Sequence, residues 1–577
     1  MNDLSPPGSQ VDGIDEGKRL IRVGGDTGLS LAERISGRLQ AMAWRTPFHD
    51  FRLRGRHPLK LIAVPDDPFA GDVARGRALL DGQLAFRGDG RAIDGFDPTA
   101  PDLSRAFAAH VQSFTWLRDL STVATRAQGA PIAEALMRQW LARHADKVTE
   151  PAWTPELWGR RILMWTSHAP LILSSSDLVY RSKVLNTLAR GARHLDRSAD
   201  RAPVGPARIA AWCGVVAAGL LIPGGDVRRA FGEGGLGRAL ATGMFADGGT
   251  VGRSPAGQLD AIMLLTMLRA VYAARRLDPP EAIETALARL VPPLLGVVLG
   301  DRGLGSWQGG APIDADTLDS VIAATGVRTR PLRQARDWGY QRISAGSAVL
   351  VMDAAPPPVA RLVEGGCAST LAFELSDGPA RMVVNCGGAH MANAQLPSAL
   401  TQGLRTTAAH STLTIGDSNS TAIHPDGTLG RGVAEVELAR AETDAASRIE
   451  ASHDGYVRRF GFVHRRTIAV GTEGRDVRGE DSLTPRGRRV AAETGFAIRF
   501  HLAPGVRVSP TADGLAAVLR LPGNIVWQFR CRGAVLAVEE SVWIDAAGRP
   551  HGTEQLVITG AAPAGGASVS WWFHRAR

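Results

Sequence analysis

The chain has 577 residues, 44% of them hydrophobic and 21% charged, and a formal net charge of +9. This composition excludes a disordered chain, and the length exceeds one ordinary hydrophobic core, so two or more domains are expected. The cysteines (Cys213, Cys367, Cys386 and Cys531) show no CxxC spacing, which argues against a disulfide framework or an all-cysteine zinc site.

The chain shows no targeting signal of the usual kind. Residues 1–28 are polar and acidic, without a basic start followed by an apolar core, so they predict a flexible leader and no signal peptide. A cytoplasmic location is therefore expected, with the periplasm as the alternative. The longest apolar stretch, 258–277, contains Asp260 and Arg269 and predicts a buried helix, not a membrane span.

Hydrophobic periodicity predicts a helical first half. An amphipathic helix is expected at 29–44, and apolar residues such as Phe107 and Val111 recur at helical spacing in 105–120. Pro131 is expected to open the next helix, because proline is favoured in a first turn. Further helices are predicted at 155–173, 178–195, 206–221, 226–243, 256–277 and 280–299.

The hydrophobic period changes from about 3.6 to two near residue 337. Residues 496–502 (FAIRFHL) and 525–531 (IVWQFRC) place apolar side chains at alternate positions, as strands with one buried face do. Many such strands, separated by turn residues, indicate an antiparallel sandwich. The predicted fold class is α+β and multidomain: a helical domain over 29–330, then a β-sandwich over 337–577, with the junction as the expected ligand site.

The stretch 364–415 concentrates the residues suited to chemistry. An Asp-Gly pair at 377–378 separates two apolar strands and predicts a hairpin in which both turn residues take positive φ. A third strand, TTAAHSTLTI, follows. Three candidate ligands lie at the ends of these strands: Cys367, Asn385 and His410.

This stretch resembles the C-terminal sheet domain of the heparinase II/III-like polysaccharide lyases. The segments LAFEL, VNCG and AAHST match the family pattern in order and register. The resemblance covers most of the chain and implies an incomplete α/α toroid for the helical domain. In this register Gly365 stands at the family's catalytic histidine, and the zinc-ligand positions hold Cys367, Asn385 and His410, of which only His410 keeps the family residue.

The resemblance implies β-elimination on an acidic, uronate-containing glycan, which needs a carboxylate neutraliser, a base and an acid. Gly257 and Gln258 stand where the family has Tyr-His, and the Asn position falls in 204–212, which contains no Asn. The predicted function is a lyase with a degenerate catalytic set. The alternative is a non-catalytic acidic-glycan-binding or envelope-associated protein on the lyase scaffold; hydrolysis by a carboxylate pair is a further alternative.

The candidate catalytic residues are His410 and Tyr456. Tyr456 lies in SHDGYVRRFG and is interpreted as facing the site, with a structural hydrogen-bond anchor as the alternative. Tyr272 lies within an apolar helix and is interpreted as a core residue.

The candidate substrate-binding residues are mostly basic. Ser254 and Pro255 predict a helix start that can receive an anion beside Arg253, with a plain cap as the alternative. If a site binds a polyanion, its arginines should converge there and binding should weaken with salt. The full predicted set is Arg253, Ser254, Arg405, His453 and Arg458.

The metal prediction depends on Asn385, which replaces a carboxylate poorly, although Cys367 and His410 are competent zinc ligands. We therefore expect no cofactor and a hydrogen bond between His410 and the Asn385 amide, with zinc as the alternative. The expected partner is an acidic polysaccharide or oligosaccharide. Nucleic acid is not expected, since the sequence shows no RRM, helix-turn-helix or zinc-finger pattern.

Overall fold

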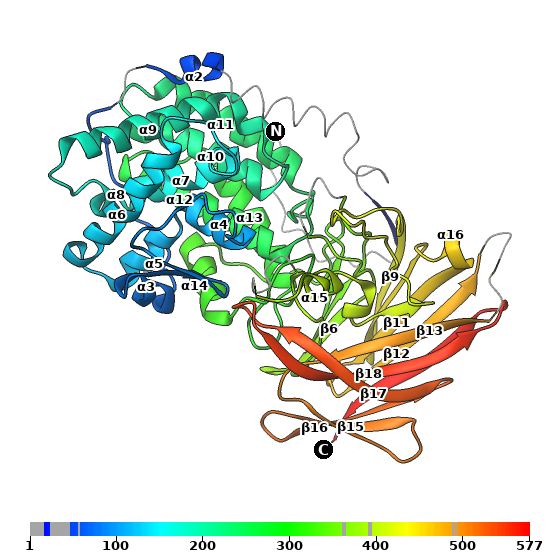
Figure 1. The fold of residues 1–577 in the computed structure, drawn as a ribbon. Helices are drawn as coiled ribbons and strands as arrows, with labels where there is room; N and C mark the ends of the chain where they lie inside the picture. Colours follow the sequence, from blue (N-terminus) through cyan, green and yellow to red (C-terminus); the bar gives the residue numbers. More distant parts are fainter. Residues whose placement is uncertain are drawn as a thin grey trace, which may run out of the picture.

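The computed structural model describes residues 17–22, 47–55, 58–359, 365–389, 395–486, 490 and 493–576. Figure 1 shows two halves side by side, helices in blue to green and strands mainly in yellow to red. The predicted fold class is confirmed, because helices precede an antiparallel sandwich along the chain. The helix expected at 29–44 lies outside the described residues.

The first half is built from helices, with one small hairpin after α3. The elements are α2 (Pro47–Leu53), α3 (Val73–Leu80), β2 (Gln83–Phe86), β3 (Asp89–Ala92), α4 (Arg105–Ser113), α5 (Trp116–Val123), α6 (Arg126–His144), α7 (Pro155–Ser167), α8 (Ala169–Ile172), α9 (Leu178–Ser198), η1 (Ala199–Arg201), α10 (Pro206–Leu221), α11 (Asp226–Gly243), α12 (Pro255–Ala274), α13 (Glu281–Gly296) and α14 (Ala315–Thr325).

Helix α10 forms the centre of this half. Its sequence is apolar on all sides, every residue from Ile209 to Leu221 is buried, and α7, α9, α11 and α12 pack around it. Gly159 of α7 allows close contact, because a Cβ there would lie 2.0 Å from the Ala210 carbonyl oxygen. No helix in the described part of the chain combines the length and apolar character needed to cross a bilayer.

Two predicted helix boundaries are wrong. The single helix expected at 105–120 is split into α4 and α5, because Phe114 takes a left-handed φ of 62°. Helix α6 begins before Pro131, with a capping box formed by Thr125 and Gln128, so the proline lies inside the helix. The Thr-x-x-Gln pattern was therefore the stronger start signal.

The second half consists of two antiparallel sheets. The large sheet has the strand order β1-β9-β10-β11-β12-β19-β16-β15-β14, and the small sheet has the order β17-β18-β13-β7-β6-β5-β4, with β8 paired to β13. The elements are β1 (Lys18–Ile21), β4 (Tyr340–Ala345), β5 (Ala348–Asp353), β6 (Phe373–Asp377), β7 (Ala380–Val384), α15 (Ser398–Gly403), η3 (Thr407–Ala409), β8 (Leu413–Ile415), β9 (Glu435–Glu442), β10 (Ala446–His453), α16 (Val457–Phe460), β11 (Phe462–Gly471), β12 (Asp476–Pro485), β13 (Thr494–Leu502), β14 (Arg507–Pro510), β15 (Ala516–Leu521), β16 (Ile525–Arg532), β17 (Val535–Ile544), β18 (Pro550–Ala562) and β19 (Ala567–Arg575).

The core of the sandwich follows the predicted alternation. Strand β13 buries Phe496, Ile498 and Phe500, and β16 buries Trp527 and Phe529. These side chains belong to one apolar cluster with residues of both sheets, so each sheet turns one face inward.

The expected flexible leader contains a strand. Lys18–Ile21 forms β1 and pairs antiparallel with β9, with Arg19 opposite Glu437. Leu20 is buried in the sandwich core and anchors the strand. Four residues with one buried side chain carry too little periodicity for a sequence-based strand prediction.

The Asp-Gly hairpin is present with a different turn. Asp377 pairs with Ala380 in the ladder, so Gly378 and Pro379 form the loop. Only Gly378 has a positive φ, of 52°, because the proline ring fixes a negative φ. The third strand of this region is shorter than predicted, since η3 precedes β8.

Candidate functional site

The predicted site residues surround the junction where the start of α12 meets the sandwich. The loop 305–310 (GSWQGG) lies between them, and a Cβ on Gly310 would lie 3.0 Å from the Ala256 Cβ of α12. A Cβ on Gly309 would lie 2.5 Å from the Gly365 carbonyl oxygen, and a Cβ on Gly388 would lie 2.2 Å from that of Gly310. Glycines therefore let this loop pack where the resemblance places catalytic residues.

Arg253 holds the start of α12 against the sandwich. Its guanidinium lies 2.5 Å from the Asp353 carboxylate, and both side chains are buried. It also donates to the carbonyls of Trp338 at 2.7 Å and Pro356 at 2.8 Å, above the ring of Tyr340. These protein partners occupy the guanidinium, so the structure does not support the predicted substrate contact.

Asp353, which the sequence analysis missed, joins three segments of the junction. Its second carboxylate oxygen accepts from the Gln308 amide at 3.2 Å and the Ser369 hydroxyl at 2.7 Å. The carbonyl oxygen of Gln308 accepts the Cys367 N–H at 3.1 Å. The sequence did contain one signal for this role, because Asp353 is a carboxylate at the end of the apolar strand AVLVMD.

Cys367 and His410 do not act as a ligand pair in this arrangement. The His410 Nδ1–H donates to the Thr406 carbonyl at 2.7 Å, and the Cys367 thiol lies 3.5 Å from the Gly365 carbonyl. Burial raises the pKa of Cys367 to about 11 and lowers the pKa of His410 to about 4. The thiol is therefore protonated near neutral pH.

Asn385, the third candidate metal ligand, is hydrogen-bonded on both sides of its amide. Its carbonyl oxygen accepts the Ser411 N–H at 3.1 Å, and its amide donates to Glu374 at 3.1 Å. The expected bond to His410 is not formed, because that ring turns to Thr406. Among the described residues, no three His, Cys, Asp or Glu side chains are placed to hold a metal, so this set does not fit zinc.

Glu374 is a buried carboxyl group in the same region. Its Oε1 accepts from the backbone N–H groups of Ser306 and Asn385, each at 3.2 Å. Its buried Oε2 has no hydrogen-bond partner within the described residues. Burial raises the pKa of Glu374 to about 7, so the protonated form is populated near neutrality.

Tyr456 and His453 lie inside the sandwich. The Tyr456 hydroxyl donates to the Leu413 carbonyl at 2.8 Å, and burial raises its pKa above the usual value. This is the structural anchor considered as the alternative. The Nε2 of His453 lies 3.2 Å from His464, and burial holds the pKa of His453 well below its usual value. Neither buried side chain supports its predicted catalytic or binding role.

The three remaining predicted binding residues do not share a surface. Ser254 is a plain N-cap whose hydroxyl accepts a first-turn N–H at 3.3 Å. Arg405 is buried and donates to the Gly366 carbonyl at 2.7 and 3.0 Å. Only Arg458, on α16, is exposed. Arg253 and Arg405 are thus buried against backbone carbonyls while Arg458 is exposed, and their convergence on a bound polyanion stays a prediction.

The positions aligned with the family's acid and base carry no such group. Gly257 and Gly365 have no side chain. Gln258 is buried, accepts the Thr250 N–H at 2.8 Å and donates to the Leu290 carbonyl at 2.7 Å. This arrangement fixes the helix start but offers no proton exchange to a ligand.

A cysteine and a histidine missed in the sequence also lie together. The Cys386 sulfur is 3.4 Å from His501 Nδ1, which is 2.8 Å from the Ser541 hydroxyl. The His501 Nε2–H donates to the Ala408 carbonyl at 2.9 Å. Burial raises the pKa of Cys386 to about 12, so this buried pair does not supply a nucleophile.

A second buried network crosses the sandwich. Arg466 contacts Asp481 at 2.8 and 3.0 Å and donates to the Ser411 carbonyl at 2.7 Å. The Trp571 indole donates to Asp481 at 2.8 Å. Burial alone would raise the pKa of Asp481, but Arg466 and His464 hold it well below its usual range.

The sandwich and the junction can now be compared with known proteins. Residues 327–572 match the family model described as heparinase II/III-like, C-terminal. This match covers the sandwich half of the chain. Over 557 residues the chain is 29% identical to "FtsZ-localized protein C" of Caulobacter vibrioides, covering 91% of this chain and 92% of that protein.

Solved structures show the same fold. A heparinase III structure has a TM-score of 0.70 at 13% identity, covering 96% of this chain and 93% of that chain. A heparan sulfate lyase mutant from Pedobacter heparinus has a TM-score of 0.60 at 13% identity, covering 96% and 92%. The chain thus shares a fold that combines an incomplete α/α toroid with an antiparallel β-sandwich.

Proposed function

We propose that this protein binds an acidic glycan without cleaving it. The observation that carries this proposal is that the candidate side chains at the junction are already hydrogen-bonded to other groups of the protein. Arg253 is saturated by Asp353 and backbone carbonyls, while His410 and Tyr456 bond to backbone carbonyls in buried positions.

The lyase predicted from the sequence needs an acid and a base that reach the sugar. The positions aligned with these groups hold Gly257, Gln258 and Gly365, and the loop 305–310 packs against Gly365. Neither candidate from the sandwich, His410 or Tyr456, is exposed. These observations favour the non-catalytic alternative.

Two observations support an acidic glycan as the ligand. The formal net charge of +9 favours polyanions in general. The fold is shared with a heparan sulfate lyase, a protein named for an acidic polysaccharide. The proposed partner is thus a uronate- or sulfate-bearing chain.

The test separates binding from cleavage. The purified chain is incubated with heparan sulfate, chondroitin sulfate and polygalacturonate, and the ultraviolet absorbance of unsaturated uronate is followed. We expect no increase above a heat-denatured control, together with salt-sensitive binding of fluorescein-labelled heparan sulfate. Enzyme-dependent absorbance would contradict the proposal, and so would the absence of binding to all three glycans.

A second function is favoured by the relative named for its localisation with FtsZ, because the likeness extends over 91% of this chain. We propose that this protein also gathers where FtsZ does, and that it is cytoplasmic. A fluorescent fusion produced in Caulobacter vibrioides cells lacking that relative should coincide with labelled FtsZ. A diffuse or purely periplasmic signal would contradict this proposal.

A further inference from the structure

The outward face of the large sheet carries a cluster of exposed arginines. We call this cluster, on β12, β16, β15 and β14, the basic face. Each of its guanidinium groups lies in the solvent-facing register, and none makes a hydrogen bond or ion pair with the described residues. Its members are Arg478, Arg530, Arg532, Arg520 and Arg507.

A tryptophan lies between two of these arginines. In the strand register, Arg478 of β12 is directly opposite Trp572 of β19, and Trp572 is directly opposite Arg530 of β16. Trp572 is half-buried, so part of its side chain is accessible to solvent. Adjacent strands lie about 4.8 Å apart, which separates the two arginine backbones by roughly 10 Å. This spacing suits two separate anionic groups rather than a single carboxylate.

The rest of the basic face repeats the same sign of charge. Arg507 of β14 is directly opposite Arg520 of β15, an arrangement that is destabilising for like charges. Arg532 follows Arg530 on the same side of β16. The carboxylates on the same side of β12, Asp476 and Glu480, contact His574 and Ser568 and form no ion pair with these arginines. The unpaired guanidiniums therefore make this surface complementary to a polyanion.

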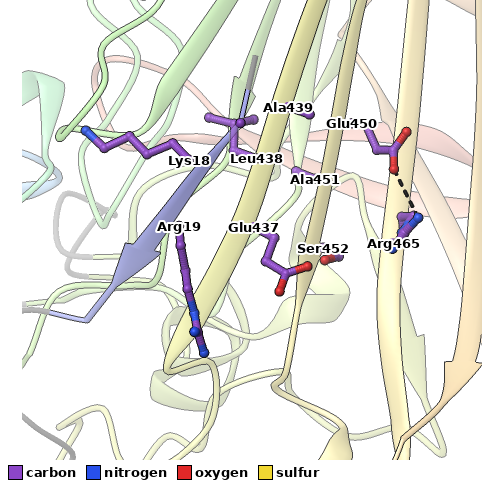
Figure 2. Close-up of a pocket in the computed structure, with 10 residues that line it drawn as sticks. Lys18, Arg19, Glu437, Leu438, Ala439, Glu450, Ala451, Ser452 and Arg465 are labelled. Carbon is purple, nitrogen blue, oxygen red and sulfur yellow. Dashed lines mark hydrogen bonds and ion pairs between the residues drawn. The ribbon is translucent and has the colours of Figure 1, made fainter. Parts of the chain in front are cut away.

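The other half of the same sheet is balanced. Arg19 pairs with Glu435, and Glu450 pairs with Arg465 at 3.0 Å and Arg448 at 2.6 Å. Figure 2 shows Arg465 directed at Glu450 of the neighbouring strand, among the residues of β1, β9, β10 and β11 that line a hollow of ≈ 390 Å³. Exposed arginines are thus neutralised on one half of this face and left without ion pairs on the other.

We infer that the basic face is the acidic-glycan-binding surface, away from the junction. This inference rests on the proposed function and adds the location of the ligand. One sugar ring stacks on Trp572, and carboxylate or sulfate groups of the neighbouring sugars receive the planar guanidiniums of Arg478 and Arg530. Arg520 and Arg507 extend the contact to further sugars of the glycan.

A glycan fits this surface better than a nucleic acid. Proteins that bind single strands use successive aromatic side chains, one for each stacked base. Arg478, Trp572 and Arg530 instead offer one indole between two guanidiniums. This arrangement matches a polymer with one apolar ring face flanked by anionic groups.

The test uses the full chain and fluorescein-labelled heparan sulfate oligosaccharides. The variant Arg478→Gln with Arg530→Gln is compared with Arg448→Gln with Arg465→Gln, which removes the same charge from the balanced half. We expect the first pair to weaken binding by at least about tenfold and to flatten its salt dependence. The control pair should stay within about twofold of the wild type, because its charges already have partners.

A third variant tests the ring. Trp572→Ala should lower the affinity but leave the salt dependence unchanged, because it removes stacking and no charge. Thermal unfolding of all variants, with melting points near that of the wild type, verifies that the sheet remains folded.

Each outcome has a separate meaning. If the wild type binds no acidic glycan, the proposed function fails together with this surface. If it binds and the Arg478/Arg530 variant binds equally well, only the surface is overturned. Equal weakening by both arginine pairs also overturns it, because net charge alone would then explain binding. Tighter binding of single-stranded DNA than of the glycan at equal salt would overturn the choice of ligand.

Discussion

Arg253 and Asp353 form a buried ion pair of 2.5 Å between the start of α12 and the end of β5. Loss of one partner leaves a charge without compensation, which typically costs about 3–5 kcal/mol. We predict that Arg253→Met lowers the free energy of unfolding by about this amount in urea titrations followed by tryptophan fluorescence. Arg302→Met, at an exposed pair with Asp319, should cost at most about 1 kcal/mol. Equal losses in the two variants would contradict the prediction.

Glu374 predicts an unusual pH dependence of stability. Burial raises its pKa to about 7 in the folded chain, above the ordinary value of about 4.5 for an exposed glutamate. Between these values the unfolded carboxyl is ionised while the folded one is protonated, so its contribution to stability is lost as pH rises. From about pH 5 to about pH 8 the loss should approach 2–3 kcal/mol.

The measurement compares the wild type with Glu374→Gln at each pH. The variant keeps a neutral side chain, so the difference in unfolding free energy between the two proteins should change in favour of the variant as pH rises. A difference that is constant over this range would show that Glu374 ionises normally.

His410 has a structural role in this arrangement, which predicts the effect of its removal. His410→Ala removes a buried ring and leaves the Thr406 carbonyl without its donor, at a cost of about 1–3 kcal/mol. Thermal unfolding measures this loss, and binding of heparan sulfate by the folded variant should be unchanged. Stoichiometric zinc in the purified wild type that disappears in His410→Ala would overturn this role.

Substitution of Asp481 should lower the free energy of unfolding more than substitution of His410 does. Asp481→Asn keeps the shape but removes the charge that compensates the fully buried Arg466. We expect a destabilisation of about 3–5 kcal/mol in denaturant titrations. Asp476→Asn, at an exposed pair with His574, is the matched control on the same strand, and a comparable effect there would contradict the prediction.

The fold could be predicted because it depends on local periodicity. The uniformly apolar sequence of α10 indicates a buried helix, and the alternation in β13 indicates a half-buried strand. Where a single residue decides a boundary, as Phe114 does between α4 and α5, periodicity continues across the break and hides it.

The candidate site could not be predicted in the same way, because its partners are distant in sequence. Arg253 and Asp353 are 100 residues apart, so the sequence near Arg253 does not show that its charge is already compensated. The row of Arg478, Trp572 and Arg530 depends on the order of β12, β19 and β16, which alternation within each strand does not specify. Tyr456 was correctly given two interpretations, and only its contact with Leu413 separates them.

Strand β1 also sets the order in which the large sheet can be completed. Arg19 and Glu435 lie 416 residues apart, so β1 leaves the ribosome long before the strand it will cover. Until β1 returns, β9 presents free backbone N–H and C=O groups at the edge of the sheet, where other chains can pair. β1 can therefore join the sheet only after Glu435–Glu442 has been made, and this step covers the edge of β9 against pairing with other chains.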